Sequence, residues 1–356
     1  MESDLATLVG LVSKYSPSGS ERGAVDWLVG QMNSLGFTRA SVDEAGNAVG
    51  SLGDGPRQVV LLGHIDTVPG EIQVRIEDGS LYGRGSVDAK APLACFVDAV
   101  ARMGPVPGWQ FVVIGAVEEE RNSEGARFAA QQYKPDFAVI GEPNHWDRIS
   151  LGYKGSAWAD VVVRGGQFHS AHAESSACET AVNQWLQVKA FAETFNSGRE
   201  KLFDRLLLNL RGMESGTDGF EQWARLNIGA RLPVDLPPQD WYAKLAEIVP
   251  QAIVEPHGYA IPAWVCEKNS ALVRAMLSAI RANAGTPSFV YKTGTADLNI
   301  VAPVWGCPSV VYGPGDSALD HTPNEHIELE EYRKAVTVLA AALKLLTTSK
   351  PADSNA

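Results

Sequence analysis

The sequence predicts an α/β domain built from both ends of the chain and interrupted by a smaller α+β domain. The chain has 356 residues, which is long for a single domain. Short runs at 59–62, 111–114 and 137–140 are apolar on both faces, as in strands buried inside an α/β sheet. The pattern then changes, so we expect one domain at 1–152 and 262–356 and an inserted domain at 153–261.

The individual elements follow from periodicity. Apolar residues recur at helical spacing, or form apolar runs rich in β-branched residues, and each pattern predicts one element. In the first domain we expect helices at 4–15, 22–35, 89–103, 270–284 and 328–347, with a fourth buried strand at 309–312. In the inserted domain the order is a strand at 158–164, a helix at 176–195, a strand at 225–232 and a helix at 238–248.

Composition and charge exclude several functions. Thirty basic and 42 acidic residues give a net charge of −12, whereas binding to nucleic acid or to an anionic membrane needs a basic face. No apolar run reaches the roughly 18–20 residues of a membrane span, and the first residues lack the pattern of a secretory signal. The four cysteines are far apart without a CxxC pair, so we expect reduced thiols in a cytoplasmic protein.

Histidines and carboxylates follow each predicted buried strand. Because ligands bind at the carboxyl ends of strands in open α/β sheets, we expect these side chains at one edge. The groups concerned are His64 and Asp66, Glu118–Glu120, Glu142, and His321, together with Asp88 in the Gly-rich stretch before the helix at 89–103.

Two imidazoles and three carboxylates suit a pair of divalent ions such as zinc, with one carboxylate bridging. The candidate ligands are His64, Asp88, Glu120, Glu142 and His321. Asp66 lies two residues after His64, so on a strand both face the same side and Asp66 can hold the other ring nitrogen. A further carboxylate of the acidic triplet is left to act as general base.

Each of these motifs alone has an ordinary structural explanation. The acidic triplet would suit the solvated first turn of a helix, and Gly141-Glu142-Pro143 would suit a turn. We interpret His145, His257 and His326 in this structural way. The joint placement of the other groups after successive buried strands favours a functional site.

Taken together, the motifs resemble those of the M20 metallopeptidase family of deacetylases, desuccinylases and carboxypeptidases. The matching stretches are Gly63–Asp66, Gly83–Asp88, Glu119-Glu120 with Gly125-Ala126, Gly141–Pro143 and His321–Glu325. The resemblance implies a zinc-peptidase-like catalytic domain with a mixed sheet covered on both faces, an inserted lid and dimerisation domain, and two bound ions, zinc or cobalt.

The resemblance also implies roles. His64 and Glu142 would hold one ion, Glu120 and His321 the other, and Asp88 would bridge them through a loop with a cis bond to Ala89. Asp66 would orient His64, and Glu119 would be the base, because Gly125 lies five residues after the second acid of the family's pair. His169 of the inserted domain would reach the partner's site in a homodimer, with His172 as the alternative.

Within that family, the chain is most similar to hydrolases that release lysine or ornithine from the C-terminal γ-glutamyl group of a small acidic amino-group carrier protein. The segment Lys292–Asn299 and the triplet Glu118–Glu120 carry this similarity. Arg231, Asn227 and Lys292 are candidates for the substrate carboxylate, and Asp297 for the distal ammonium. The candidates for docking the carrier are Arg199, Lys201, Arg205 and Arg211.

Two other function classes stay open. One is a different amide hydrolase of the same family, such as an acetylornithine deacetylase, a desuccinylase or a dipeptidase. The other is a non-catalytic binding protein on a peptidase scaffold. All five candidate ligands and the candidate base are present, which favours an enzyme.

Overall fold

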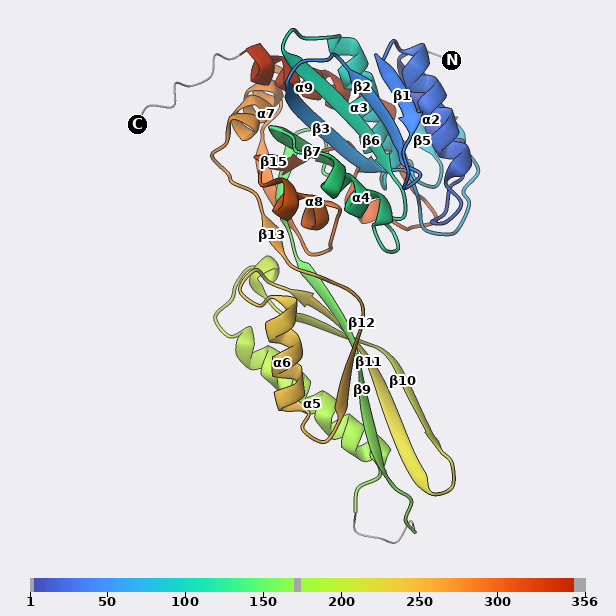
Figure 1. The fold of residues 1–356 in the computed structure, drawn as a ribbon, viewed down its shortest axis with the longest axis vertical. Coiled ribbons are helices and arrows are strands. Elements are labelled where there is room, and N and C mark those ends of the chain that lie inside the picture. Colours follow the sequence, from blue (N-terminus) through green and yellow to red (C-terminus); the bar gives the residue numbers. More distant parts are fainter. Residues whose placement is uncertain (1–2, 170–173, 349–356) are drawn as a thin grey trace. The chain divides into compact units, whose positions relative to one another are not determined.

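The computed structural model describes residues 3–169 and 174–348. The chain divides into two compact units, each with its own sheet (Figure 1). The first unit comprises the chain up to Gly152, Cys266–Val290 and the chain from Ala296. The second unit comprises Tyr153–Val265 and the short segment Tyr291–Thr295.

The first unit is organised around a mixed sheet with the strand order β1-β2-β6-β3-β7-β15-β8. These strands are β1 (Arg39–Val42), β2 (Ala48–Leu52), β3 (Arg57–His64), β6 (Trp109–Ala116), β7 (Phe137–Gly141), β8 (Arg148–Tyr153) and β15 (Ser309–Val311). The neighbours β6, β3, β7 and β15 are parallel to one another, so their carboxyl ends meet at one edge. These strands are buried over most of their length, which means that both faces of the sheet are covered.

Helices cover this sheet. They are α1 (Ala6–Val12), α2 (Arg22–Ser34), α3 (Lys90–Met103), α4 (Glu124–Gln132), α7 (Ala271–Ala282), α8 (Leu298–Trp305) and α9 (Leu329–Thr348), with 3-10 turns at Ser3–Leu5 and Ser317–Leu319. Helix α3 packs against β3, β6 and β7, and α9 packs against α3 and α7. A small separate sheet has the order β16-β5-β4, from β4 (Arg75–Glu77), β5 (Ser80–Tyr82) and β16 (His326–Glu328).

The second unit is a four-stranded antiparallel sheet with two helices (Figure 1). The strands, in the order β10-β11-β9-β12, are β9 (Gly155–Gly166), β10 (Leu207–Thr217), β11 (Glu221–Leu232) and β12 (Ile253–Ile261). Helices α5 (Ala177–Phe195) and α6 (Pro238–Ile248) pack on this sheet and on each other. Alternate residues of β9, namely Ala157, Ala159, Val161 and Val163, contribute to their shared core, as the two-residue period of a strand requires.

The predicted fold class is confirmed, and several elements were not expected. No counterpart among the expected elements exists for strands β1, β2, β8, β10 and β12, for helices α4 and α8, or for the small sheet. The two remaining short strands, β13 (Trp264–Val265) and β14 (Ser288–Lys292), were also not expected. The expected helix at 4–15 is shorter, because a 3-10 turn precedes α1 and the helix ends at Val12.

Cys95, Cys178, Cys266 and Cys307 are all free thiols. Within residues 3–169 and 174–348, none of the helices combines the length and apolar character needed to span a membrane.

Candidate metal centre

The parallel strands of the first unit deliver the candidate ligands to one edge. His64 is the last residue of β3, Glu119 and Glu120 follow β6, and Glu142 follows β7 directly. Residues 63 and 64 pair with 115 and 116, and Gly63 pairs with Gly141, so the three strands end level with one another. Asp88 precedes helix α3, and the peptide bond from Asp88 to Ala89 is cis, as expected.

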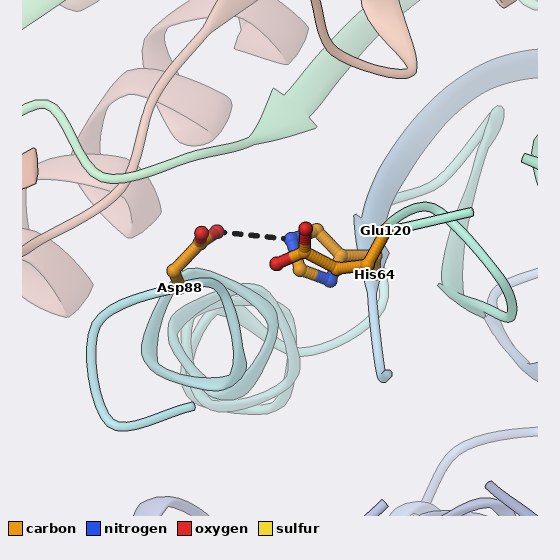
Figure 2. Close-up of side chains that lie close together, drawn as sticks. All are labelled: His64, Asp88 and Glu120. Carbon is orange, nitrogen blue, oxygen red and sulfur yellow. Dashed lines mark hydrogen bonds and ion pairs between the residues drawn. The ribbon is translucent and has the colours of Figure 1, made fainter. Parts of the chain in front are cut away.

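Asp88 lies between two imidazoles. His64 Nε2 is 3.1 Å from Asp88 Oδ1, and Figure 2 shows these two side chains with Glu120 beside them. On the other side, His321 Nε2 is 3.0 Å from Asp88 Oδ2. His321 Nε2 is also 2.9 Å from Glu120 Oε1. One potential ligand atom from each of His64, Asp88 and Glu120 lies within 4.8 Å of the others. These contacts give Asp88 one oxygen for each histidine, which is the arrangement that a bridging carboxylate needs.

The pKa values of the groups in this cluster are shifted by burial and by their hydrogen bonds to one another. Burial opposes ionisation of Asp88, but hydrogen bonds with His321 and His64 hold its pKa below the usual range. Hydrogen bonds to Asp88 and Glu120 raise the pKa of His321 to about 10. In the ion-free protein His321 therefore carries a proton at neutral pH, and a divalent cation would take the place of that charge.

Glu119 and Glu142 place two further carboxyl groups in the same region. Burial raises the pKa of Glu119 well above its usual value, and the charges of Glu142, Asp297 and Glu120 raise it further. Burial also raises the pKa of Glu142, and Asp88, Asp297 and Asp320 act in the same direction. Such crowding of carboxylates around two histidines fits divalent cations, which would offset the repulsion between them.

Asp66 holds the acidic pair in place. Its two carboxylate oxygens accept hydrogen bonds from the backbone N–H groups of Glu119 (3.0 Å) and Glu120 (3.1 Å). His64 Nδ1 lies 3.0 Å from the backbone oxygen of Asp66 and 3.5 Å from its carboxylate. Ser18 donates a 2.6 Å hydrogen bond to the same carboxylate. Sequence reasoning missed Ser18, which lies 48 residues away from Asp66 and outside every motif.

Close packing explains why residue 125, five positions after Glu120, is a glycine. A Cβ at this position would lie 2.2 Å from Asn47 Oδ1 and 2.5 Å from the backbone nitrogen of Val117. Asn47 accepts a 3.0 Å hydrogen bond from that nitrogen and donates one of 3.1 Å to the Gly125 oxygen. Glycine therefore lets the start of α4 approach the end of β6, next to Glu119 and Glu120.

Asp297 is the one substrate-binding candidate in the first unit, where it is 2% exposed. Burial raises its pKa to about 6, and a hydrogen bond with Ser123 opposes this shift. Its charge also acts on Glu119 and Glu142, so it belongs to the same group of carboxylates.

The other substrate-binding candidates belong to the second unit, whereas the candidate metal ligands belong to the first. Asn227 donates a 2.8 Å hydrogen bond to Asp160 and lies 2.9 Å from His257 Nε2, and Arg231 donates one of 3.1 Å to Thr295. Lys292 accepts a backbone hydrogen bond from Lys154.

His169 is exposed in the segment that follows β9. This segment is attached to the turn between β10 and β11, because the Gln167 backbone donates a 2.8 Å hydrogen bond to the Phe220 oxygen. The alternative residue, His172, lies outside the described residues.

Of the candidate docking residues for a carrier, Arg199 is paired with a carboxylate that offsets its charge. The Arg199 guanidinium donates to both carboxylate oxygens of Asp235, at 3.0 and 2.6 Å. Arg205 donates its Nε–H to the Arg199 backbone oxygen. Lys201 and Arg211 are exposed.

An α/β sheet whose parallel strands end in a buried cluster of histidines and carboxylates is typical of metal-dependent hydrolases. Comparison with known proteins agrees, since the model of peptidase family M20/M25/M40 matches residues 60–345. The chain belongs to this family of metal-dependent hydrolases.

Individual relatives are similar over nearly the whole chain. A protein of Deinococcus radiodurans named as a hydrolase of LysW-lysine is 45% identical, covering 94% of each chain. A protein of Thermococcus kodakarensis, provisionally named as a hydrolase of LysW-lysine and LysW-ornithine, is 40% identical over 96% of this chain and 91% of its own. The crystal structure of aminopeptidase PepT from Bacillus cereus has the same fold, with a TM-score of 0.80, 21% identity, and coverage of 97% of this chain and 98% of its own.

We expect His64→Ala and His321→Ala each to weaken the binding of one ion, because each removes a ligand. Elemental analysis after dialysis against limiting zinc would measure the ions retained per chain. His326→Ala is the matched control, since His326 lies five residues after His321 and stacks on Tyr82 rather than contacting the cluster. Retention of two tightly bound ions by both ligand variants would contradict the assignment.

Proposed function

We propose that this protein is a two-metal amide hydrolase that releases lysine or ornithine from the C-terminal γ-glutamyl group of an acidic amino-group carrier protein of the LysW kind. The observation that carries this proposal is the 45% identity, over 94% of the chain, to a relative named for LysW-lysine hydrolysis. The cluster around Asp88 supports the hydrolytic chemistry. The reaction belongs to lysine or arginine biosynthesis, and we place it in the cytoplasm.

In this proposal the ligands divide between two ions, zinc or cobalt. His64 and Glu142 would hold one ion, Glu120 and His321 would hold the other, and Asp88 would contribute to both. The contacts of Asp88 with both histidines support the bridging role. When bound, the ions would supply the Lewis acidity that activates a water and polarises the amide carbonyl.

The residues of the chain would move the protons. Glu119 accepts the proton of the attacking water and then delivers it to the leaving amine. Asp66 keeps Glu119 in place through its backbone N–H and keeps the His64 ring oriented. His169 donates a hydrogen bond to the oxyanion that forms at the amide carbon. No covalent intermediate is required.

The two structural units would divide the work. The first unit, which we equate with the expected domain at 1–152 and 262–356, performs the chemistry. The second unit, equated with 153–261, closes over the substrate and forms a homodimer. Arg231, Asn227 and Lys292 would contact the substrate carboxylate, and Asp297 the distal ammonium of lysine.

A substrate panel tests the proposed function. We expect kcat/KM for carrier-linked lysine to exceed that for acetylornithine or a simple dipeptide by about 100-fold or more, because a site built for polar groups leaves them unpaired with the wrong substrate. Zinc or cobalt should be added to each assay. The Glu119→Gln protein, purified in parallel, controls for contaminating hydrolases.

Other outcomes would point elsewhere. A preference for acetylornithine or a dipeptide would make the protein a different amide hydrolase of the family. Absence of turnover on every substrate, with two ions bound, would favour a binding protein on the peptidase scaffold.

A further inference from the structure

The segments that carry Asp88 and His321 hold each other through one buried ion pair. Arg84 lies four residues before Asp88, and Glu325 lies four residues after His321. Arg84 NH1 and Glu325 Oε2 are 2.7 Å apart, and the two side chains are 7% and 1% exposed. None of the roles assigned above involves either residue.

Glu325 accepts hydrogen bonds from the backbone at Asp88. Its Oε1 accepts hydrogen bonds from the backbone N–H groups of Val87 (2.9 Å) and Asp88 (3.1 Å). Its other oxygen accepts the hydrogen bond from Arg84. Both oxygens of this carboxylate are therefore occupied in holding the segment that ends in Asp88.

Arg84 donates a hydrogen bond to the backbone next to His321. Its NH1 donates a 3.2 Å hydrogen bond to the Thr322 oxygen, and its Nε donates one of 2.9 Å to the Gly70 oxygen. His321 has a φ of 61°, in the left-handed region that few residues other than glycine adopt. Such a conformation persists where the surrounding structure constrains it. The hydrogen bond from Arg84 constrains the backbone of Thr322, the residue next to His321.

We infer that Arg84 and Glu325 are positioning residues that together keep Asp88 and His321 facing each other in the metal centre. Each side chain holds the backbone beside the other segment's ligand, so the pair couples two ligands that are 233 positions apart in the chain. This inference rests on the proposed metal-dependent function.

The test is metal binding by the ion-free protein, measured by calorimetric titration with zinc and by the visible spectrum of added cobalt. Arg84→Lys keeps the charge but loses the fork that reaches Glu325, Thr322 and Gly70 together. Loss of a residue that supports a ligand commonly lowers metal affinity by about 10–100-fold. We expect Arg84→Lys and Glu325→Gln to weaken binding by this amount and to alter the cobalt spectrum.

A double variant covers the case in which a single variant fails to fold. Removing one partner leaves an unpaired buried charge, whereas Arg84→Gln with Glu325→Gln removes both charges together. We expect the double variant to fold and to bind zinc more weakly than the wild type. With ions at saturation, kcat should fall while KM changes little, since neither residue is assigned to the substrate.

Tyr332→Phe is the control for general loss of stability. It removes a 2.7 Å hydrogen bond from α9 to Asp98 of α3 in the same unit, and leaves the hydrogen bonds of Arg84 and Glu325 described above in place. This variant should unfold at lower urea concentration but keep the wild-type zinc affinity and cobalt spectrum. Wild-type affinity in the folded Arg84 and Glu325 variants, or an equal loss in Tyr332→Phe, would overturn the inference. Failure of the wild type to bind ions would instead refute the proposed function.

Discussion

Glu119→Gln should lower turnover by a factor of at least about 100 while the protein keeps its fold and both ions, as expected for loss of a general base. The amide preserves the size of the side chain but cannot accept a proton. Its backbone N–H still donates to Asp66, so Glu120 should stay in position. Turnover of the carrier-linked substrate and ion content should be measured on the same preparation.

The neighbouring acid provides the matched control for this result. Glu118 is the first member of the triplet, and its backbone oxygen accepts hydrogen bonds from Arg121, Asn122 and Ser123. Its carboxyl group has no role in the proposed mechanism, so Glu118→Gln should keep nearly full turnover. A large loss in Glu118→Gln with near-normal activity in Glu119→Gln would move the base by one residue.

His169→Ala should lower turnover by roughly 100-fold or more with both ions retained, which is the usual cost of removing an oxyanion donor. A mixing experiment tests whether His169 acts in the partner's site. Combining His169→Ala chains with Glu119→Gln chains should restore activity, because each heterodimer rebuilds one complete site. Statistical exchange predicts recovery to about a quarter of wild-type activity, since half of the dimers are mixed and each has one complete site.

Mixing Glu119→Gln with Glu120→Gln is the negative control for the restoration of activity. Both changes lie in the same unit, so no heterodimer contains a complete site, and activity should stay low. If His169→Ala and Glu119→Gln also fail to complement despite demonstrated exchange, His169 does not act across a dimer. A protein that is monomeric at the assay concentration would exclude shared sites altogether.

The main strands and helices could be predicted because their patterns are local. Buried strands such as β3, β6 and β7 are apolar on both faces, and their parallel pairing places their ends together. From the sequence alone, that rule of topology indicated His64, the acidic triplet Glu118–Glu120 and Glu142 as candidates. The register within the triplet came from the family resemblance.

Two of the strands that were not predicted, β10 and β12, have the opposite character. Most residues of β10 and β12 are exposed or half-buried, so neither strand shows a buried apolar pattern. Strand β12 also contains Pro256 and Gly258, which argue against a strand in the interior of a sheet. Both are edge strands, where proline and polar residues are tolerated because one side of the strand has no ladder to support.

The sequence by itself determined the fold class, the family and the candidate ligands, since these depend on residue type, spacing and the order of strands. Only the tertiary structure decided which groups meet. His321 reaches Glu120 across 201 positions, and Glu325 reaches the Asp88 backbone across 237. Contacts of this kind leave no periodic trace, because they arise from the packing of distant loops at the sheet edge. Ser18 and the Arg84–Glu325 pair were therefore visible only once the chain was folded.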